Sequence, residues 1–363
     1  MLGDLPLVDA HCHAVTTRDL DADAFARWCT EASGPAPPGV SYLDGPAGLA
    51  IRRWCAPALD LPPHAPAADY LARRAELGAE EATRRLLRAA NLAELLVDTG
   101  LPGDLTGRAL ADAAGAGYTE VVRLESVAER VAAAGVSAED FAPAFAAALR
   151  EAAAVKSILA YRHGLDIDPE PPSRREVIAA AGAWLRAGGT RLTDAVLLRH
   201  LLWTAVDLGR PIQLHTGFGD RDLALPRSDP SLLQPWYARI EPTGVPIVLL
   251  HCYPYHRQAG WLAHVYPNVY IDVGLTLTHT GPRAAAILAE YFELAPFGKI
   301  LYSSDAYGLA ELYLVGAAQF RAGLSALLHA WVREGALATA DAERMARAVG
   351  ADNARRVYGR RES

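Results

Sequence analysis

Two histidines near the start of the chain have the spacing of metal ligands. His11 and His13 lie in the segment Asp9-Ala-His-Cys-His, directly after a short apolar run. Residues two apart in a β-strand share one face, so both imidazoles are expected to point the same way. Two imidazoles on one rigid strand can begin a zinc site, although ordinary packing also produces isolated His-X-His pairs.

Three further polar side chains follow apolar runs in the same manner. His215 and His251 each close one run, and Asp305 follows a third. Imidazoles and a carboxylate that converge on one end of a parallel barrel form a metal site with room for a water molecule. The metal would lower the pKa of that water, and Asp305 would take its proton and pass it to a leaving group. Chance is a poor explanation for four apolar runs that all end near a ligand-capable side chain.

Lys156, which follows another apolar stretch, has three interpretations. Carboxylated by CO2, it would be an anionic ligand that bridges two metals. Unmodified, it would be a cation that binds an acidic substrate. As a structural residue, it would pair with a carboxylate such as Glu125. Arg123 and Glu125, at the end of the preceding run, are expected to form an ion pair of their own.

Five residues near these runs are candidates for contact with a substrate: Tyr161, Arg162, Phe218, Tyr253 and His256. Arg162 could hold a substrate carboxylate in a bidentate pair, or it could lie in a surface loop. Phe218 is expected to line the pocket beside His215. His256 is either a substrate contact or a solvent-exposed loop residue.

Eight apolar runs predict the strands that position these side chains. They span residues 7–10, 93–97, 119–124, 153–160, 211–214, 245–250, 269–273 and 299–302. Several runs lack polar alternation, as do parallel strands that are buried on both faces. Helical patterns, such as 173–187 and 281–294, separate most of them. We therefore predict an α/β fold, a (β/α)8 TIM barrel, whose active site lies at the carboxyl ends of the strands.

The first two predicted strands are far apart, and residues 16–90 between them predict a helical insertion that caps the active-site face. A charged helical pattern covers 67–91, and two helices, at about 310–334 and 339–357, are expected to finish the chain. A barrel of this kind commonly forms one unit even at this length, so we expect residues 1–363 to be a single domain.

Bulk composition excludes several classes of protein. The net charge of −7 disfavours nucleic acid or an anionic membrane as the main partner. The four cysteines show no CxxC spacing, which favours a reduced, cytoplasmic setting. Neither a signal peptide nor an apolar run approaching ~18 residues is found. We expect a small-molecule substrate, and a homodimer is left open.

The order of the candidate ligands resembles the pattern of the amidohydrolase superfamily. Segments 215–220, 253–255, 266–274 and 302–305 look like its amidohydrolase-2 branch. Segments 156–165 and 353–359 are similar, within that branch, to the amidohydrolase domain fused to glutamine-synthetase-like domains in fungal developmental and plant nodulin-type proteins. The likeness runs from residue 5 to about residue 359, and we expect the barrel here to stand alone.

The resemblance implies one or two divalent metals, usually zinc or manganese. The implied ligands are His11, His13, His215 and Asp305. In binuclear relatives, the counterparts of Lys156 and His251 also bind metal. In mononuclear and decarboxylating relatives, the sixth-strand histidine acts on the substrate instead, so the role of His251 is open.

Two reactions fit that implied metal site. The first is hydrolysis of an amide, lactam, ester or lactone, with Asp305 as the proton shuttle. The alternative is decarboxylation of a small aromatic or conjugated acid by a metal-dependent lyase, in which His251 would act as acid or base. A third reading, a non-catalytic barrel kept for binding or assembly, is disfavoured by the complete set of ligand-capable side chains.

Overall fold

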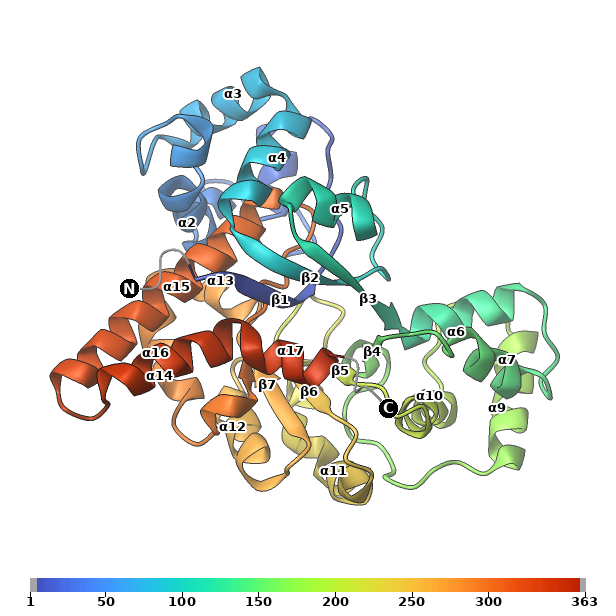
Figure 1. The fold of residues 1–363 in the computed structure, drawn as a ribbon. Coiled ribbons are helices and arrows are strands. Elements are labelled where there is room, and N and C mark those ends of the chain that lie inside the picture. The colour runs from blue at the N-terminus through green and yellow to red at the C-terminus, as the bar shows by residue number, and fades with distance from the viewer. Residues whose placement is uncertain (1–4, 360–363) are drawn as a thin grey trace.

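Eight parallel strands form one sheet in the computed structural model, which describes residues 5–359 (Figure 1). Their order in the sheet is their order in the sequence, from β1 to β8. The strands are β1 (Leu7–Cys12), β2 (Leu92–Asp98), β3 (Gly117–Arg123), β4 (Ala154–Ser157), β5 (Ile212–Thr216), β6 (Ile247–His251), β7 (Val269–Asp272) and β8 (Ile300–Leu301). Each overlaps one of the eight apolar runs, so the predicted strands are present.

Hydrogen bonds between the two outermost strands bring the sheet round to near closure. The amide of Ala10 donates to the carbonyl of Tyr302 at 3.1 Å, and the amide of Asp305 donates to the carbonyl of His11 at 3.0 Å. Helices surround the sheet on the outside (Figure 1). The predicted (β/α)8 barrel is therefore confirmed.

Eleven α-helices of the described chain lie between the strands from β2 onward or directly follow β8. They are α5 (Gly107–Ala114), α6 (Leu124–Ala133), α7 (Phe141–Ala148), α8 (Leu159–Arg162), α9 (Arg174–Arg186), α10 (Ala195–Asp207), α11 (Gln234–Ile240), α12 (His256–Val265), α13 (Thr276–Thr280), α14 (Ala284–Tyr291) and α15 (Ala310–Arg333). Helix α9 begins at a capping box, in which Ser173 and Glu176 satisfy each other's backbone amides. None of the helices within residues 5–359 is long and apolar enough to span a membrane.

The carboxyl-terminal helices close the floor of the barrel. The predicted helix at 339–357 is three segments: α16 (Thr339–Arg347), a π-helical stretch η8 (Ala348–Asp352) and α17 (Asn353–Tyr358). Ala351 and Ala354 pack against the apolar side chains inside the barrel, and Gln213 within it donates to the hydroxyl of Tyr358 at 2.9 Å. The amino-terminal end is thus filled, and the other end is left for chemistry.

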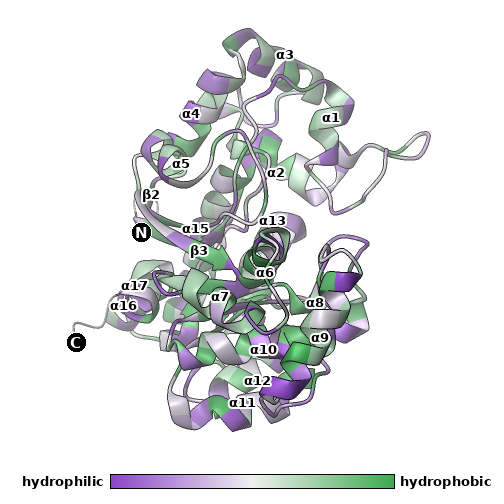
Figure 2. Ribbon diagram, turned by 90° about the vertical axis from the view of Figure 1, so that its right-hand side faces the viewer, coloured by the Kyte–Doolittle hydropathy of each residue, from purple (hydrophilic) through white to green (hydrophobic). Residues whose placement is uncertain are grey.

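The segment between β1 and β2 holds four α-helices. They are α1 (Ala22–Arg27), α2 (Pro46–Trp54), α3 (Ala67–Leu77) and α4 (Ala79–Ala89), and they lie together beside β1 and β2 (Figures 1 and 2). Along α3 and α4, hydrophilic and hydrophobic positions are interleaved (Figure 2). The single helical pattern at 67–91 is interrupted at Gly78, whose φ of 79° ends α3.

Short 3-10 helices make up the remaining elements of the described chain. They are η1 (Tyr42–Asp44), η2 (Pro57–Leu59), η3 (Leu225–Ser228), η4 (Pro230–Leu233), η5 (Glu241–Thr243), η6 (Gly281–Arg283) and η7 (Phe297–Lys299). The last of these leads directly into β8.

A buried ion pair and a buried hydrogen bond link the segment between β1 and β2 to helix α15 of the barrel. On α3, the guanidinium of Arg74 lies 2.8 Å from the carboxylate of Glu311 on α15, and the hydroxyl of Tyr70 donates to the same oxygen at 2.9 Å. The side chains of Arg74 and Glu311 are 4% and 0% exposed. Neither charge can be solvated by water if its partner is lost.

Removing one partner of this pair is expected to destabilise the protein strongly. Arg74→Ala should lower the free energy of unfolding by about 3–5 kcal/mol, because it leaves the carboxylate of Glu311 buried and unpaired. Arg84→Ala on α4 breaks an exposed pair with Glu81 and should cost only about 0–1 kcal/mol. Urea unfolding followed by circular dichroism measures both. Equal effects of the two substitutions would contradict this assignment.

Candidate metal centre

The predicted ligands meet at the carboxyl end of the barrel. Oδ1 of Asp305 lies 3.1 Å from Nε2 of His11 and 3.2 Å from Nε2 of His13. Oδ2 of Asp305 lies 3.6 Å from Nε2 of His251. Nζ of Lys156 lies 2.9 Å from Nε2 of His11. Side chains from strands far apart in the sequence therefore surround one carboxylate.

His215 joins this group through ring contacts. Its ring centroid lies 4.7 Å from that of His251, and the centroids of His11 and His251 are 5.8 Å apart. The ring centroids of His11, in β1, and His13, which directly follows β1, are 4.7 Å apart. The structure thus brings all six sequence-predicted ligand candidates to one place.

Several of these nitrogens are buried without a hydrogen-bond partner. They are Nδ1 of His11, Nε2 of His215 and both ring nitrogens of His251. Buried polar atoms nearly always have a partner, so such a group of orphaned atoms calls for an explanation. Imidazole nitrogens around a carboxylate are the donor set of a zinc-type site, and a bound divalent cation would satisfy them.

The contact between His11 and Asp305 points to the same conclusion. An ammonium group only donates hydrogen bonds, so Nε2 of His11 must accept the one from charged Lys156. The same nitrogen faces Oδ1 of Asp305, which is also an acceptor and makes no aligned hydrogen bond. Two acceptors held this close need a positive charge between or beside them. The residues therefore fit a metal ion.

Burial sets the charge of the candidate ligands. Desolvation, with the charge of Lys156 adding to it, lowers the pKa of His11 to about 3. Desolvation also lowers the pKa of His251 to about 4. Burial alone would raise the pKa of Asp305, but His251, His11 and His13 hold it well below its usual range. Neutral imidazoles and an ionised carboxylate are the forms that bind metals.

Two of these residues have unusual backbone conformations. His251 has a φ of 67° and Asp305 a φ of 49°, both in the left-handed region. Such a conformation costs about 1–3 kcal/mol in a non-glycine residue and persists where the surroundings enforce it. The amide of His251 donates to the carboxylate of Asp272 at 2.7 Å, which holds the first of them in place. Backbone strain of this kind clusters at functional sites.

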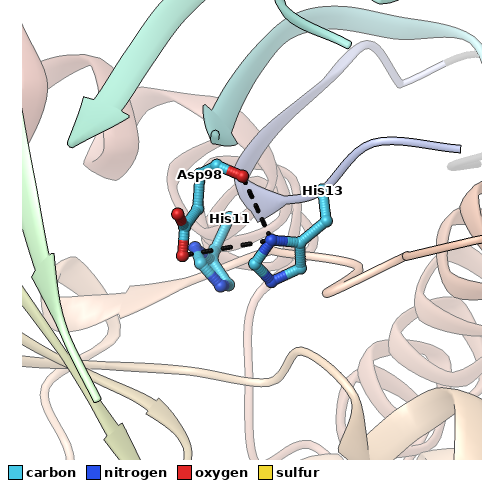
Figure 3. A group of neighbouring side chains, drawn as sticks. All are labelled: His11, His13 and Asp98. Atoms are coloured by element: carbon cyan, nitrogen blue, oxygen red, sulfur yellow. Dashed lines mark hydrogen bonds and ion pairs between the residues drawn. The ribbon is translucent and has the colours of Figure 1, made fainter. Parts of the chain in front are cut away.

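Asp98, at the end of β2, belongs to the same cluster although the sequence reasoning missed it. Nδ1 of His13 lies 3.2 Å from the backbone carbonyl of Asp98 and 3.9 Å from its Oδ2 (Figure 3). Both carboxylate oxygens are already engaged, one by the amide of Gly100 and the other by Arg123 at 2.6 Å. We therefore assign Asp98 to orienting His13, and Asp305 to facing the metal.

The structure corrects two expectations about Glu125. Arg123 binds Asp98 and does not pair with Glu125, because α6 begins at Leu124 and turns Glu125 away from the strand. Glu125 instead accepts hydrogen bonds from the hydroxyl of Ser157 at 2.6 Å and from a backbone amide. Lys156 is also not its partner; the nearest carboxylate to Nζ of Lys156 belongs to Asp98, at 3.8 Å.

Three of the predicted substrate contacts lie around the cluster. The ring of Tyr161 is 4.6 Å from that of His215, and its hydroxyl accepts from the amide of Asp220. Phe218 packs edge-on against Tyr253, with centroids 6.0 Å apart. Their roles toward a substrate stay predictions.

The other two candidates are engaged elsewhere. Arg162 lies in α8, where its guanidinium binds Glu129 at 2.6 Å, so it is not in a surface loop. His256 begins α12, is buried, and lies 2.6 Å from a carboxylate oxygen of Glu290. The expectation that it could be a solvent-exposed loop residue is therefore wrong. His256 also stacks on Tyr253, with ring centroids 5.3 Å apart, and the roles of Arg162 and His256 toward a substrate stay predictions.

Comparison with solved structures finds proteins that share this fold. A solved protein of Lactobacillus casei ATCC 334, named as a metal-dependent hydrolase, is 29% identical, with a TM-score of 0.86 over 98% of this chain and 96% of that chain. Glucuronate isomerase from Caulobacter crescentus, 16% identical with a TM-score of 0.67 over 100% of this chain and 93% of that one, shares the fold.

Sequence comparisons find a relative and identify the family. Protein fluG of Emericella nidulans (strain FGSC A4) is 33% identical over 241 residues, which are 61% of this chain and only 28% of that protein. This chain therefore spans little more than a quarter of that relative. A family model described as amidohydrolase matches residues 8–360. The chain belongs to the amidohydrolase family.

Proposed function

We propose that this protein is a hydrolase that uses water activated by a bound divalent metal to cleave a C–N bond (amide or lactam) or a C–O bond (ester or lactone) of a small molecule. The observation that carries the proposal is the Asp305 carboxylate, which faces the nitrogens of His11, His13 and His251 in a buried site. Family membership and the likeness to a protein named as a metal-dependent hydrolase support it.

The metal would be held by His11, His13, His215 and Asp305, and zinc is the ion that such a donor set favours, with manganese as the second choice. When bound, the ion would lower the pKa of a water molecule toward neutrality. Asp305 would accept the proton of that water and return it to the leaving group. Asp98 would keep the ring of His13 in its binding orientation.

Lys156 and His251 decide how many ions the site would hold. Burial lowers the pKa of Lys156, which moves its amine toward the neutral, nucleophilic form. Carboxylation of that amine would provide a ligand for a second ion, with His251 as a further ligand. With a single ion, the unpartnered nitrogens of His251 would be free to act as acid or base toward the substrate.

Metal analysis combined with a substrate screen tests the proposal. The protein is treated with a chelator, reconstituted with zinc or manganese, and assayed against panels of amides, lactams, esters and lactones. We expect one or two ions per chain, and hydrolysis that disappears on chelation and returns on reconstitution. Hydrolysis that survives complete metal removal would contradict the proposal. One ion per chain together with CO2 release from aromatic acids would favour the decarboxylase alternative.

A further inference from the structure

A chain of side-chain contacts borders the metal centre on the side away from the barrel floor. It starts at Tyr161, which packs on His215 and whose hydroxyl accepts a hydrogen bond from the amide of Asp220, on the loop that also carries Phe218. The ring centroid of Phe218 lies 5.8 Å from that of His279 on α13. Nε2 of His279 lies 3.6 Å from Oε1 of Glu31, which belongs to the segment between β1 and β2.

The chain of contacts returns to the metal centre at Tyr307. The hydroxyl of Tyr307 donates to Oε1 of Glu31 at 3.0 Å, and Tyr307 follows the predicted ligand Asp305 by two residues. The charge of Asp305 is close enough to shift the pKa of Glu31, Tyr307 and His279. Glu31 is thus a carboxylate supplied to the mouth of the site by the helical insertion.

The position of Glu31 is fixed by packing. Trp28, three residues before it, lies with its ring 5.5 Å from that of Tyr307. The same indole covers Gly308, where an added Cβ would come within 2.1 Å of the ring. Gly308 also has a φ of 70°, so a side chain is excluded on both grounds. The insertion therefore sits tightly against the loop that carries Asp305.

The carboxylate of Glu31 has no positively charged partner among residues 5–359. Its only ion-pair contact is His279, and burial lowers the pKa of that histidine to about 4, so its ring is neutral at pH 7. Burial, followed by the charge of Asp305, raises the pKa of Glu31 to about 7. A largely buried carboxylate without a charged partner is stabilised by any cation that reaches it.

The charged groups nearby offer no such cation. The other acidic group whose charge acts on Glu31 is Asp220, which makes the mouth more negative. No arginine or lysine of the described chain forms an ion pair with Glu31. Two arginines from neighbouring segments pair elsewhere, Arg162 with Glu129 and Arg191 with Asp222. A substrate that carries a positive charge would supply the cationic partner that Glu31 lacks.

Space for a ligand lies beside this cluster. His279 lines a groove of about 520 Å³ together with residues 29–30, 39–42 and 44–47 of the insertion. The side chain of Glu31 is 19% exposed, and the hydrogen bond from Tyr307 and the contact with His279 both involve Oε1. Its second oxygen, Oε2, makes no hydrogen bond within the described chain, so it is available to a ligand.

We propose that Glu31 is a substrate-recognition residue, and that it selects small molecules that carry an amino group at a distance from the bond to be cleaved. This inference rests on the proposed function, because the amino group is placed relative to a reacting group held at the metal. The competing explanation is that Glu31 only ties the insertion to Tyr307. The two explanations differ in what they predict for ligands.

Matched pairs of metal-binding probes separate them. The hydroxamate group binds divalent metals, so 3-aminopropano- and 4-aminobutanohydroxamic acids are compared with propano- and butanohydroxamic acids on the zinc-loaded protein at pH 8, by isothermal titration calorimetry. A charge-assisted contact with Glu31 should make the amino compounds bind about 10-fold more tightly or better. Glu31→Gln should bring the ratio of the two affinities to near unity. Glu80→Gln, an exposed glutamate on α4, should keep the wild-type ratio.

Each outcome bears on the inference. Equal binding of amino and neutral hydroxamates by the wild-type protein overturns it and leaves the metal centre intact. A loss of affinity for both series in Glu31→Gln, with an unchanged ratio, means that Glu31 is only a structural tie. Failure of every hydroxamate to bind the zinc-loaded protein overturns the proposed function itself, and the inference falls with it. The wild-type comparison needs no variant, so misfolding of Glu31→Gln does not prevent the test.

Discussion

Replacing Asp305 with asparagine is expected to lower kcat about 10²–10⁴-fold, the range of a lost general acid–base group. Asparagine has the same shape, so the contacts of this side chain with His11, His13 and His251 can be kept. Its amide cannot accept a proton from water, and it removes the negative charge that neighbouring histidines now stabilise. The rate is measured on the substrate that the hydrolysis screen identifies, with zinc present in excess.

A matched control distinguishes this effect from a general loss of stability. Asp341 lies on α16 and pairs with Arg344, and its side chain is 47% exposed. Asp341→Asn should therefore leave the rate within about twofold of the wild type, since surface substitutions change stability little. The circular dichroism spectrum of Asp305→Asn should match that of the wild type. A folded Asp305→Asn protein that keeps more than a tenth of the wild-type rate would show that another group moves the proton.

The double replacement His11→Ala and His13→Ala is expected to abolish metal binding. The two rings are the imidazoles at the carboxyl end of β1, where His11 lies in the strand and His13 directly follows it. Binding of metal to the folded state alone stabilises a protein by about 2.7 kcal/mol when the free metal is at 100 times its Kd. Zinc should therefore raise the Tm of the wild-type protein and leave that of the double variant unchanged.

Inductively coupled plasma mass spectrometry provides the direct measurement. We expect one or two ions per wild-type chain after removal of free metal, and only traces on the double variant. His264→Ala is the control, because His264 is exposed and its ring contacts only the carbonyl of Leu294. It should bind as much metal as the wild type. Full metal occupancy or full activity in the double variant would mean that the site has been placed wrongly.

The strands could be predicted because burial leaves a local signature. Every residue of β5 and β6 is buried, and apolar residues fill most of their positions. The histidines near their carboxyl ends, His215 and His251, stand out against such runs. The same rule applied to β2 would have found Asp98, which directly follows Leu95-Leu96-Val97. The sequence reasoning missed Asp98 because it relied mainly on histidines at the ends of apolar runs, although the end of β2 shows the same pattern.

Other features could not be read from local sequence. The boundary of α6 at Leu124 decides whether Arg123 faces Glu125 or Asp98, and a one-residue shift reverses the answer. Glu31 and His279 have ordinary neighbours in the sequence. They matter only because segments nearly 250 residues apart approach each other at the barrel mouth. Such contacts depend on the packed fold, and no local pattern encodes them.

The hydrogen bond from the amide of Asp305 to the carbonyl of His11 also has a consequence for how the protein is made. During synthesis the first strand is made long before the last. His11 and His13 can therefore contact Asp305 only after nearly the whole chain has been made. Contacts of such sequence separation are the slow step of folding, because a long loop must close before they form. A metal ion bound between the histidines of the first strand region and Asp305 would stabilise only the closed barrel, and would therefore favour the last step of folding.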